Sequence, residues 1–395
     1  MSSPPKITLA IASDLHAHSN HPVSPSHLNT SAPEGVANQH PITGLLTLIE
    51  KEHLTATALL SPGDLGHQAD PQGIQYSWNA LKRLSVALGA EFYTATAGNH
   101  DIDSRYQGND HAPEHILKSL TPSFPLGDDR FDDRYWARAY VIKDTNPFRL
   151  VLLNSSAYHG NTPTEKNHGR IDKQTLEDLR KDLTNRGKRE INILLCHHHP
   201  HQHSELGLGE DDVMKQGQLL LDVLGSGQHG RWLVIHGHKH HPKMSYAAGG
   251  GGSAIVFAAG SLCSTLYPEL QTVARNQFYL VTIDPAKCSG GLVGRVQAWD
   301  WASGIGWIQG RDNSGLPAHS GFGLRADPSL VAKRLAEIVD ASPTPIPWVT
   351  LTQNYSDILY ALPQDLNRIE VELSETYKIQ ITKIGSVPHE IGRSL

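Results

Sequence analysis

Short apolar runs alternate with segments of helical periodicity over roughly the first 300 residues of the chain. The apolar and β-rich runs predict strands at residues 6–12, 55–60, 92–97, 136–142, 148–153, 190–195, 232–235, 254–258 and 278–283. Apolar residues at helical spacing predict helices at residues 42–53, 73–88, 172–183 and 213–224. This alternation predicts a layered α/β domain in which helices flank the sheets.

The pattern changes in the last part of the chain. Trp299, Trp301 and Trp307 are followed by Gly/Ser/Asn-rich sequence and then by a proline-rich stretch at residues 342–347. We therefore predict a main domain over residues 1–300 and a C-terminal extension over residues 301–395, which serves as a cap or an oligomerisation element. For the three tryptophans, packing between domain and extension is favoured over stacking on a nucleobase.

Two further patterns concern connections and the extension. Residues 249–252 are all glycine, and we interpret them as a hairpin loop rather than a linker because strand-like sequence resumes at once. Residues 368–373 and 377–381 alternate between apolar and polar positions, which predicts strands in the extension.

The composition is that of an ordinary globular protein, with 38% hydrophobic and 19% charged residues among 395. The net charge of −6 provides no general attraction for nucleic acid or an anionic membrane. The apolar stretch at residues 7–11 is too short to span a bilayer and has no cationic leader. The three cysteines are expected to be small buried hydrophobes in a reducing compartment. We predict a cytoplasmic protein with no membrane segment.

Histidine changes this picture, because several of the 24 histidines gather in polar clusters that follow predicted strands. Five clusters occur in a fixed order: Asp14-Leu15-His16, Gly63-Asp64, Gly98-Asn99-His100-Asp101, Cys196-His197-His198-His199-Pro200 and Gly237-His238-Lys239-His240. Loops that leave the carboxyl ends of neighbouring strands converge in open α/β sheets. We therefore expect the five clusters to meet in one cleft.

The ligand types in these clusters point to metal ions. An Asp-x-His pair offers a hard oxygen and a borderline nitrogen, which suits Mn, Fe, Zn, Ni or Co better than Ca or Mg alone. Asn99 adds a neutral oxygen, and three adjacent imidazoles after a buried strand need partners. His238 and His240 lie on the same side of an extended loop and can span two ions. The set predicts two divalent metals.

The order of these motifs resembles the calcineurin-like metallophosphoesterase superfamily over roughly residues 6–290. The resemblance implies an α/β/β/α sandwich with a binuclear metal centre. Its implied ligands are Asp14, His16, Asp64 and His240 for one ion, and Asp64, Asn99, His198 and His238 for the other. His198 is preferred over its competitor His197 because the ligand in similar proteins precedes a His-Pro pair. His100 would be the non-ligand residue that stabilises the transition state or protonates the leaving oxygen.

The chain also departs from the superfamily pattern. Many members have a second aspartate where this chain has His67, so the partner of His100 is open among Asp101, Asp70 and a water. The Arg-Gly of Ser/Thr protein phosphatases is replaced by Gln68-Ala69, which argues against that branch. Residues 169–176 and 212–217 are similar to segments of bacterial cyclic-nucleotide and glycerophosphodiester phosphodiesterases. Two ordinary amphipathic helices are the alternative explanation.

The expected activity is hydrolysis of a phosphodiester, or of a phosphomonoester, on a small molecule or nucleotide. Two close cations lower the pKa of a shared water and clamp the phosphoryl oxygens for in-line attack by hydroxide. A DNA-repair-type nuclease shares the same motifs, but it would favour a basic cleft, and the acidic net charge argues against it. A non-catalytic scaffold is the third alternative. The expected partners are a phosphoester substrate and a second copy of the chain in a homo-oligomer; nucleic acid is disfavoured.

Overall fold

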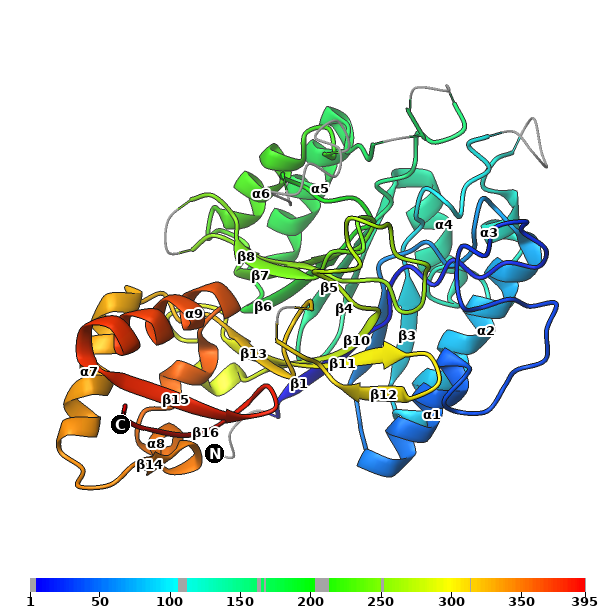
Figure 1. Cartoon of the computed structure of the whole chain (residues 1–395). Coiled ribbons are helices and arrows are strands. Elements are labelled where there is room, and N and C mark those ends of the chain that lie inside the picture. The colour runs from blue at the N-terminus through cyan, green and yellow to red at the C-terminus, as the bar shows by residue number, and fades with distance from the viewer. Residues whose placement is uncertain are drawn as a thin grey trace.

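Two stacked sheets form the centre of the molecule (Figure 1). The computed structural model describes residues 5–105, 112–161, 165–166, 168–202, 213–249, 252–312 and 314–394. The first sheet contains, in order, β12 (Gly306–Gln309), β11 (Gly294–Ala302), β10 (Gln277–Ile283), β1 (Ile7–Ile11), β2 (Ala58–Ser61) and β3 (Phe92–Ala95), with β13 (His319–Phe322) also paired to β11. The second contains β4 (Tyr140–Asp144), β5 (Arg149–Leu153), β6 (Ile191–Leu195), β7 (Arg231–His236), β9 (Ile255–Ala258) and β8 (Lys243–Tyr246).

Alternating side chains of the second sheet explain the layers. Leu150 and Leu152 of β5 belong to the large core shared with the first sheet, whereas Val151 and Leu153 belong to a second apolar cluster. That second cluster is closed by the apolar faces of α5 (Lys173–Arg186) and α6 (Gly217–Gly225). The helices α1 (Pro41–Glu52) and α2 (Pro71–Ala87) pack on the first sheet. The predicted layered α/β fold with flanking helices is therefore confirmed.

Most predicted elements occur where the periodicity put them, but the strand predicted at residues 136–142 begins too early. The side chain of Asp128 accepts a hydrogen bond from the Arg130 N–H and caps α4 (Asp129–Arg138). This helix ends at Arg138, its C-cap residue Ala139 has a φ of 58°, and β4 begins only at Tyr140. The helix predicted from residue 213 begins at Gly217. Residue 212, the first residue of the segment 212–217 discussed above, lies outside the described chain.

The glycine run is part of a hairpin connection, as predicted. Strands β8 and β9 are antiparallel neighbours, with Tyr246 opposite Ile255. Residues 250 and 251 themselves lie outside the described part of the chain. Cys196, Cys263 and Cys288 are buried free thiols, in agreement with their expected role as small hydrophobes.

The C-terminal extension has its own apolar cluster, but it begins later than predicted. Residue 300 lies inside β11, and β12 and β13 still belong to the first sheet. The third cluster is built by α7 (Pro328–Asp340), α8 (Trp348–Asn354), α9 (Pro363–Glu372), β15 (Ile379–Ile384) and β16 (Val387–Arg393). The last of these strands also pairs with β14 (Ile346–Pro347). We therefore propose a boundary at residues 323–327.

The alternation at residues 368–373 predicted a strand, but these residues are helical. Ile369 and Leu373 are four residues apart and both buried, with Leu366 partly buried three residues earlier. This spacing matches one face of a helix, and that face packs against α7. The second predicted strand is present as β15, although it begins at Ile379 rather than at residue 377.

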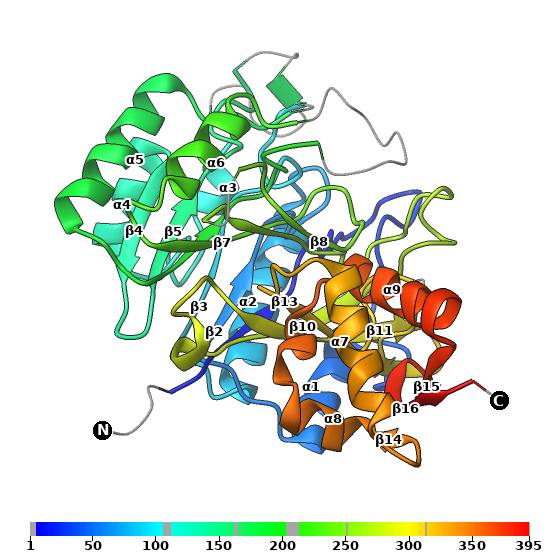
Figure 2. The same cartoon turned by 90° about the vertical axis from the view of Figure 1, so that its left-hand side faces the viewer.

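The sheet register shows where the extension joins the main domain. Ile7, at the start of β1, is opposite Ile283, which is opposite Gly294, which is opposite Phe322 at the end of β13. The chain therefore leaves the first sheet at the edge where β1 begins. Figure 2 shows the extension (orange to red) packed beside this part of the sheet. The ligand loops follow the carboxyl ends of the strands, whereas the extension lies near the amino end of β1. Its position therefore favours a structural role or an interface over a cap on those loops.

The three tryptophans pack under α1 rather than between the main domain and the extension. Trp299 and Trp301 are buried, and the Trp307 Nε1–H donates a hydrogen bond to the Pro41 carbonyl at 2.9 Å. Gly44 makes this contact possible, because a Cβ there would lie 2.3 Å from the Ala37 carbonyl oxygen and 2.9 Å from Trp301. The expectation that these side chains pack, rather than stack on a base, fits this arrangement.

We expect Gly44→Ala to destabilise the protein by about 1–3 kcal/mol, because the added methyl group overpacks the contact between α1 and the tryptophans. The free energy of unfolding in urea measures this. Thr47→Ala, on the exposed face of the same helix, is the matched control and should change stability far less. Equal stability of Gly44→Ala and Thr47→Ala would contradict the packing described for this helix.

Candidate metal centre

All five polar clusters follow the carboxyl ends of strands, as the sequence predicted. Asp14 follows β1, Asp64 follows β2 and Asn99 follows β3, all in the first sheet. His197 follows β6 and His238 follows β7 in the second sheet. Because the two sheets are stacked, loops from both reach the same region, and the clusters meet there.

The backbone at these positions is strained. Five of the eleven non-glycine residues with positive φ in the described chain come from the predicted ligand set: Asp14 at 51°, His16 at 48°, Asp64 at 53°, His238 at 79° and His240 at 53°. Such conformations are uncommon for non-glycine residues and concentrate where surrounding structure enforces a functional geometry.

Two glycines allow the loops to approach these side chains closely. A Cβ on Gly98 would lie 2.1 Å from the Asp64 Oδ1 atom, and a Cβ on Gly237 would lie 2.3 Å from the Asp14 Oδ2 atom. Neither position can carry a larger residue without moving a carboxylate. The glycines of the motifs are therefore needed for close packing.

The first group of ligand atoms comes from Asp14, His16, Asp64 and His240. The His16 Nε2 atom lies 3.1 Å from the His240 Nε2 atom, 3.5 Å from Asp64 Oδ2 and 4.0 Å from Asp14 Oδ1. The His240 Nε2 atom lies 3.4 Å from the same Asp14 oxygen. Three of these side chains are buried almost completely and His240 is 5% exposed.

The second group comes from Asp64, Asn99, His197 and His238. The His197 Nε2 atom lies 3.3 Å from Asp64 Oδ2, 3.0 Å from Asn99 Oδ1 and 3.2 Å from the His238 Nδ1 atom. The His238 Nδ1 atom is 3.0 Å from the same Asn99 oxygen. Asp64 Oδ2 therefore belongs to both groups.

These distances fit a metal site. Ligand atoms that each lie about 2.0–2.2 Å from one ion, at tetrahedral or octahedral angles, are separated by about 3–3.6 Å. Ring nitrogens of His16 and His240 that face each other can make at most one hydrogen bond, and only if one of them is protonated. A cation satisfies both lone pairs at once. The donor set of carboxylate, amide and imidazole suits a divalent transition metal.

Neighbouring groups orient the imidazoles for this task. The His197 Nδ1–H donates to the Pro62 carbonyl at 3.0 Å, so the Nε2 atom, which lies beside Asp64, is the ligand atom once it has lost its proton. The His240 Nδ1 atom is 3.0 Å from Ser264 Oγ. The backbone N–H of His238 donates to Asp14 Oδ1 at 3.0 Å, so one loop positions ligands of both groups.

The geometry favours His197 over His198, which the His-Pro register had selected. The His198 Nδ1 atom is 2.9 Å from Ser155 Oγ, and the His198 ring lies beside His238 with the centroids 4.6 Å apart. One of its ring nitrogens is still within 4.8 Å of ligand atoms of His197 and His238. His198 therefore lies beside the second group, while His197 makes the direct approach to Asp64.

His100 lies beside the first group. Its backbone N–H donates to Asp64 Oδ1 at 2.8 Å, and its ring meets the His16 ring edge-on with the centroids 4.7 Å apart. The His100 Nδ1 atom accepts a hydrogen bond from the Gln68 N–H at 3.3 Å, which puts the ring proton on Nε2. Burial lowers the pKa of His100 to about 4, so the neutral imidazole presents an N–H donor.

Neither candidate carboxylate is a hydrogen-bond partner of His100 within the described chain. Asp101 accepts from the N–H groups of Gly66 at 3.0 Å and Gly98 at 2.9 Å, and so ties two motif loops together. Burial, followed by the nearby Asp64, raises the pKa of Asp101 to about 7. Asp70 instead accepts from the Gly73 N–H and from Ser19. The ring of His67, which replaces the expected aspartate, lies 4.9 Å from the His100 ring.

The motifs did not single out two residues near the centre. Ser155 contacts His198 and also accepts from the backbone N–H of His197 and His198. The charge of Arg105 is close enough to lower the pKa of both His100 and His67, after the larger effect of burial. A lone serine after β5 and a lone arginine in a loop carry no recognisable spacing, so only the fold brings them here.

A family model described as calcineurin-like phosphoesterase matches residues 7–242, which is more than half of the chain. The chain belongs to the calcineurin-like phosphoesterase family. The resemblance inferred from the motifs is thus confirmed. No curated protein matches the sequence significantly.

Solved structures also resemble this calcineurin-like phosphoesterase, at low sequence identity. The purple acid phosphatase PPD1 of yellow lupin (Lupinus luteus) is 13% identical with a TM-score of 0.48, over 78% of this chain and 54% of that one. PhoD is 10% identical with a TM-score of 0.47, over 81% and 70% of the two chains. The NAD nucleotidase NadN of Haemophilus influenzae is 12% identical with a TM-score of 0.36, over 77% and 60%. The chain thus spans about half the length of the lupin phosphatase.

We expect metal affinity to fall as the pH is lowered below about 9. Burial opposes charge on His197, but the Asp64 carboxylate outweighs it and raises the pKa of His197 to about 9. A metal ligand must be a neutral imidazole, so binding below that pH displaces one proton and affinity decreases roughly tenfold per pH unit. Titration calorimetry with Mn²⁺ in buffers of different ionisation enthalpy measures the proton released.

The matched variants for that titration are His197→Ala and His198→Ala. The first should lose the released proton together with one bound ion, and the second should retain both. Metal affinity that is constant between pH 7 and pH 8.5 in the unmodified protein would contradict the role given to His197.

Proposed function

We propose that this protein is a binuclear metal-dependent phosphoesterase that hydrolyses a phosphodiester, or alternatively a phosphomonoester, of a small molecule or nucleotide. The observation that carries the proposal is the position of Asp64 Oδ2, 3.5 Å from His16 Nε2 and 3.3 Å from His197 Nε2. A carboxylate oxygen shared by two sets of ligand atoms is the arrangement that a bridged pair of ions needs.

The proposed ligands divide into two sets. Asp14, His16, Asp64 and His240 would hold one ion, and Asp64, Asn99, His197 and His238 would hold the other. Divalent Mn, Fe, Zn, Ni or Co in these positions would supply Lewis acidity, which lowers the pKa of a water molecule and neutralises phosphoryl charge. Among the proposed ligands, Asp64 is expected to matter most for metal binding, because both sets lose a ligand when it is removed.

His100 is the proposed hydrogen-bond donor that stabilises charge on the leaving oxygen. Hydrolysis forms a bond from the water oxygen to phosphorus and breaks the bond from phosphorus to the alcohol oxygen. Negative charge develops on the departing oxygen, and the neutral Nε2–H of His100 would stabilise it by donating a hydrogen bond, while the proton lost by the attacking water completes the alcohol. The Gln68 N–H bond to Nδ1 holds the ring in that tautomer. His100 is thus oriented by the backbone rather than by a carboxylate.

The preference for a diester is supported by two segments that pack against the histidine run. A Cβ on Gly169 would lie 2.5 Å from the His198 Cβ, and the Lys215 N–H donates to the Gly169 carbonyl at 2.8 Å. The Met214 N–H donates to the His199 carbonyl at 3.0 Å. The two segments that resemble bacterial cyclic-nucleotide and glycerophosphodiester phosphodiesterases therefore both help to position His198 and His199.

Two other expectations stay predictions. Within the described chain, no helix has both the length and the apolar character that crossing a bilayer requires. A cytoplasmic location and assembly into a homo-oligomer through the extension remain to be tested.

We expect the Mn²⁺-loaded protein to hydrolyse bis(p-nitrophenyl) phosphate. Asp64→Asn should lower kcat/KM by roughly 10³-fold or more, because both metal sets depend on this carboxylate. His100→Ala should lower kcat by about 10²–10³-fold while the protein still binds metal, because the leaving oxygen loses a hydrogen-bond donor. The measurement is initial-rate kinetics together with metal content by mass spectrometry.

His53→Asn is the matched control, since His53 is an exposed histidine with a φ of 53° that asparagine tolerates. It should retain the activity of the unmodified protein. Failure of the unmodified protein to turn over the diester with any of the five metals would contradict the proposed function.

A further inference from the structure

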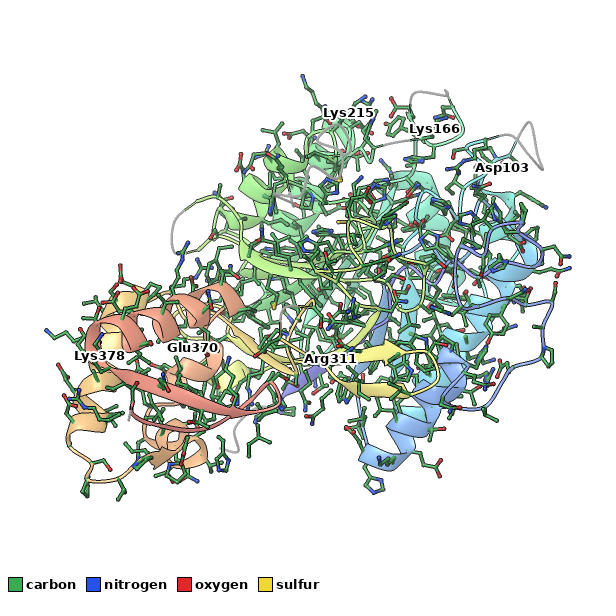
Figure 3. The ribbon with its side chains drawn as sticks, in the orientation of Figure 1. Asp103, Lys166, Lys215, Arg311, Glu370 and Lys378 are labelled. Carbon is green, nitrogen blue, oxygen red and sulfur yellow. The ribbon has the colours of Figure 1, made fainter. Side chains whose placement is uncertain are left out.

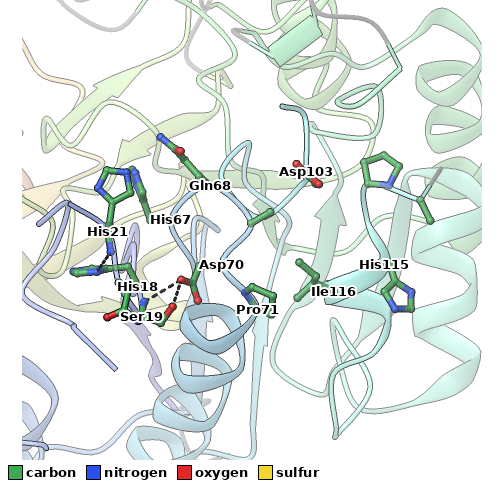
Figure 4. A pocket seen from close by; sticks show the side chains of 14 residues that line it. His18, Ser19, His21, His67, Gln68, Asp70, Pro71, Asp103, His115 and Ile116 are labelled. Carbon is green, nitrogen blue, oxygen red and sulfur yellow. Dashed lines mark hydrogen bonds between the residues drawn. The ribbon is translucent and has the colours of Figure 1, made fainter. Parts of the chain in front are cut away.

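A pocket of about 470 Å³ lies beside the candidate metal centre (Figure 4). Its lining includes four histidines: His18, His21, His67 and His115. Asp70 also lines it, and Figure 4 shows Ser19 donating to one oxygen of this carboxylate. The Gly73 N–H donates to the other oxygen at 2.7 Å. The pocket is therefore part of the metal site, and one of its carboxylates is already satisfied.

A larger cavity, of about 700 Å³, lies between the first sheet and the C-terminal extension, and we call it the extension cavity. One wall comes from β11, β13 and the loop that precedes β13, and the other comes from α8, α9 and the β15–β16 hairpin. Figure 3 shows Glu370, which lines the extension cavity, on the opposite side of the molecule from Asp103, which lines the pocket beside the metal centre. Cavities of this size at the junction of two structural units commonly bind small molecules.

Direct contacts fasten the extension to the main domain around this cavity. A Cβ on Gly321 of β13 would lie 2.1 Å from the Leu359 carbonyl oxygen, so the two backbones touch there. The Ser386 hydroxyl, in the β15–β16 hairpin, donates to the Gly310 carbonyl at 2.7 Å. Two separate parts of the extension are therefore fixed in place, and a shift of the extension that closed the cavity would break one of these contacts.

The sheet register places two nitrogen-bearing side chains on the face that the cavity covers. Arg295 of β11 is opposite Gly321 of β13, and His319 is two residues from Gly321 on the same strand. Opposite positions share a face of the sheet, as do positions two apart along a strand, so Arg295 and His319 lie on one face. Both line the extension cavity. Burial, followed by the nearby charge of Arg295, lowers the pKa of His319, so His319 offers a neutral N–H donor beside the guanidinium.

Arg295 is the charge in this lining that lacks a partner. The Lys383 ammonium lies 3.0 Å from Glu370 Oε1 and 3.4 Å from Asp312 Oδ2, so both carboxylates of the lining already face a cation. The Arg295 side chain has neither an ion pair nor a hydrogen bond within the described chain. A ligand anion would supply the missing acceptor, whereas a ligand cation would be repelled by Arg295 and would have to displace Lys383 from its carboxylates.

Most of the remaining lining is apolar. Trp348 and Leu366 are partly buried against the apolar cluster of the extension, and both also face the cavity. Val349, beside Trp348 in α8, is 68% exposed. Pro317 and Pro388 contribute from the two opposite walls. An apolar ligand group placed here would remove this surface from water, which is favourable.

We propose that the extension cavity binds a small organic carboxylate with an apolar body. The carboxylate pairs with Arg295 and accepts a hydrogen bond from His319, while the apolar body lies against Trp348 and the apolar residues around it. The site is separate from the metal centre and does not depend on the proposed phosphoesterase activity. It assigns the extension a binding role that requires no second copy of the chain.

The test uses the full-length protein and three fluorinated indoles that share one apolar body: 6-fluoroindole-3-acetate, 6-fluoroindole-3-acetamide and 6-fluorotryptamine. Titration followed by fluorine NMR measures the dissociation constant of each probe. We expect the carboxylate to bind at least about tenfold more tightly than the amide or the amine, because a charge-assisted hydrogen bond to a guanidinium is stronger than a neutral one.

Arg295→Gln distinguishes this cavity from the metal centre, which also attracts carboxylates. The variant should weaken binding of the carboxylate by about tenfold, to the level of the amide, and leave the amide unchanged. Arg334→Gln is the matched control, because Arg334 is an exposed arginine of α7 outside the lining, and it should bind all three probes as the unmodified protein does. If Arg295→Gln does not fold, Val349→Glu repeats the test at the exposed rim. Its carboxylate should repel the acetate probe, relative to the uncharged Val349→Gln.

Three outcomes would overturn the proposal. It fails if none of the three probes binds at millimolar concentration, because the cavity then holds no ligand of this class. It also fails if the amide or the amine binds as tightly as the carboxylate. Equal affinity of Arg295→Gln and Arg334→Gln for the carboxylate would place the bound probe elsewhere. All three outcomes leave the proposed phosphoesterase function untouched, since its own assay measures turnover at the metal centre.

Discussion

The carboxylate of Asp64 is the group on which the rest of the site depends. One of its oxygens faces ring nitrogens from both sheets, His16 on one side and His197 on the other. Its other oxygen accepts the backbone N–H of His100. A single side chain therefore fixes the separation of the two ligand groups and the position of His100, the proposed hydrogen-bond donor to the leaving oxygen. In the absence of cations, so many imidazoles and two carboxylates buried together would be costly, since each needs a compensating partner.

The sandwich supplies the rigidity that this arrangement requires. Strands of both sheets carry the ligand loops at their carboxyl ends, and the buried apolar side chains shared by the sheets hold these strands in place. Strained φ values at the ligand positions can then be maintained because hydrogen bonds tie the loops together. Asp101 is one such tie, since it bonds the backbone of both Gly66 and Gly98. Replacing the usual aspartate by His67 leaves the orientation of His100 to the Gln68 backbone and opens a histidine-rich pocket on that side.

Much of the fold follows from the sequence because buried strands and amphipathic helices have distinct periods. The prediction failed where an alternation of apolar residues also fitted a helix, as at residues 368–373, and where a capped helix ran into a strand, as at Trp136. The metal motifs were recognisable because their spacing is short. The choice between His197 and His198 depends on how far β6 extends before the chain turns, and a local pattern does not fix that register. The pocket was not foreseen, because its lining comes from separate loops.

The most direct test of the shared carboxylate is a crystal structure of the protein grown with Mn²⁺ and measured near the manganese absorption edge. Two anomalous peaks about 3.5–4 Å apart are expected. Asp64 Oδ2 should lie within about 2.0–2.2 Å of both, and His197 Nε2 should bind only one of them. A single peak, or two peaks that Asp64 does not bridge, would contradict the account.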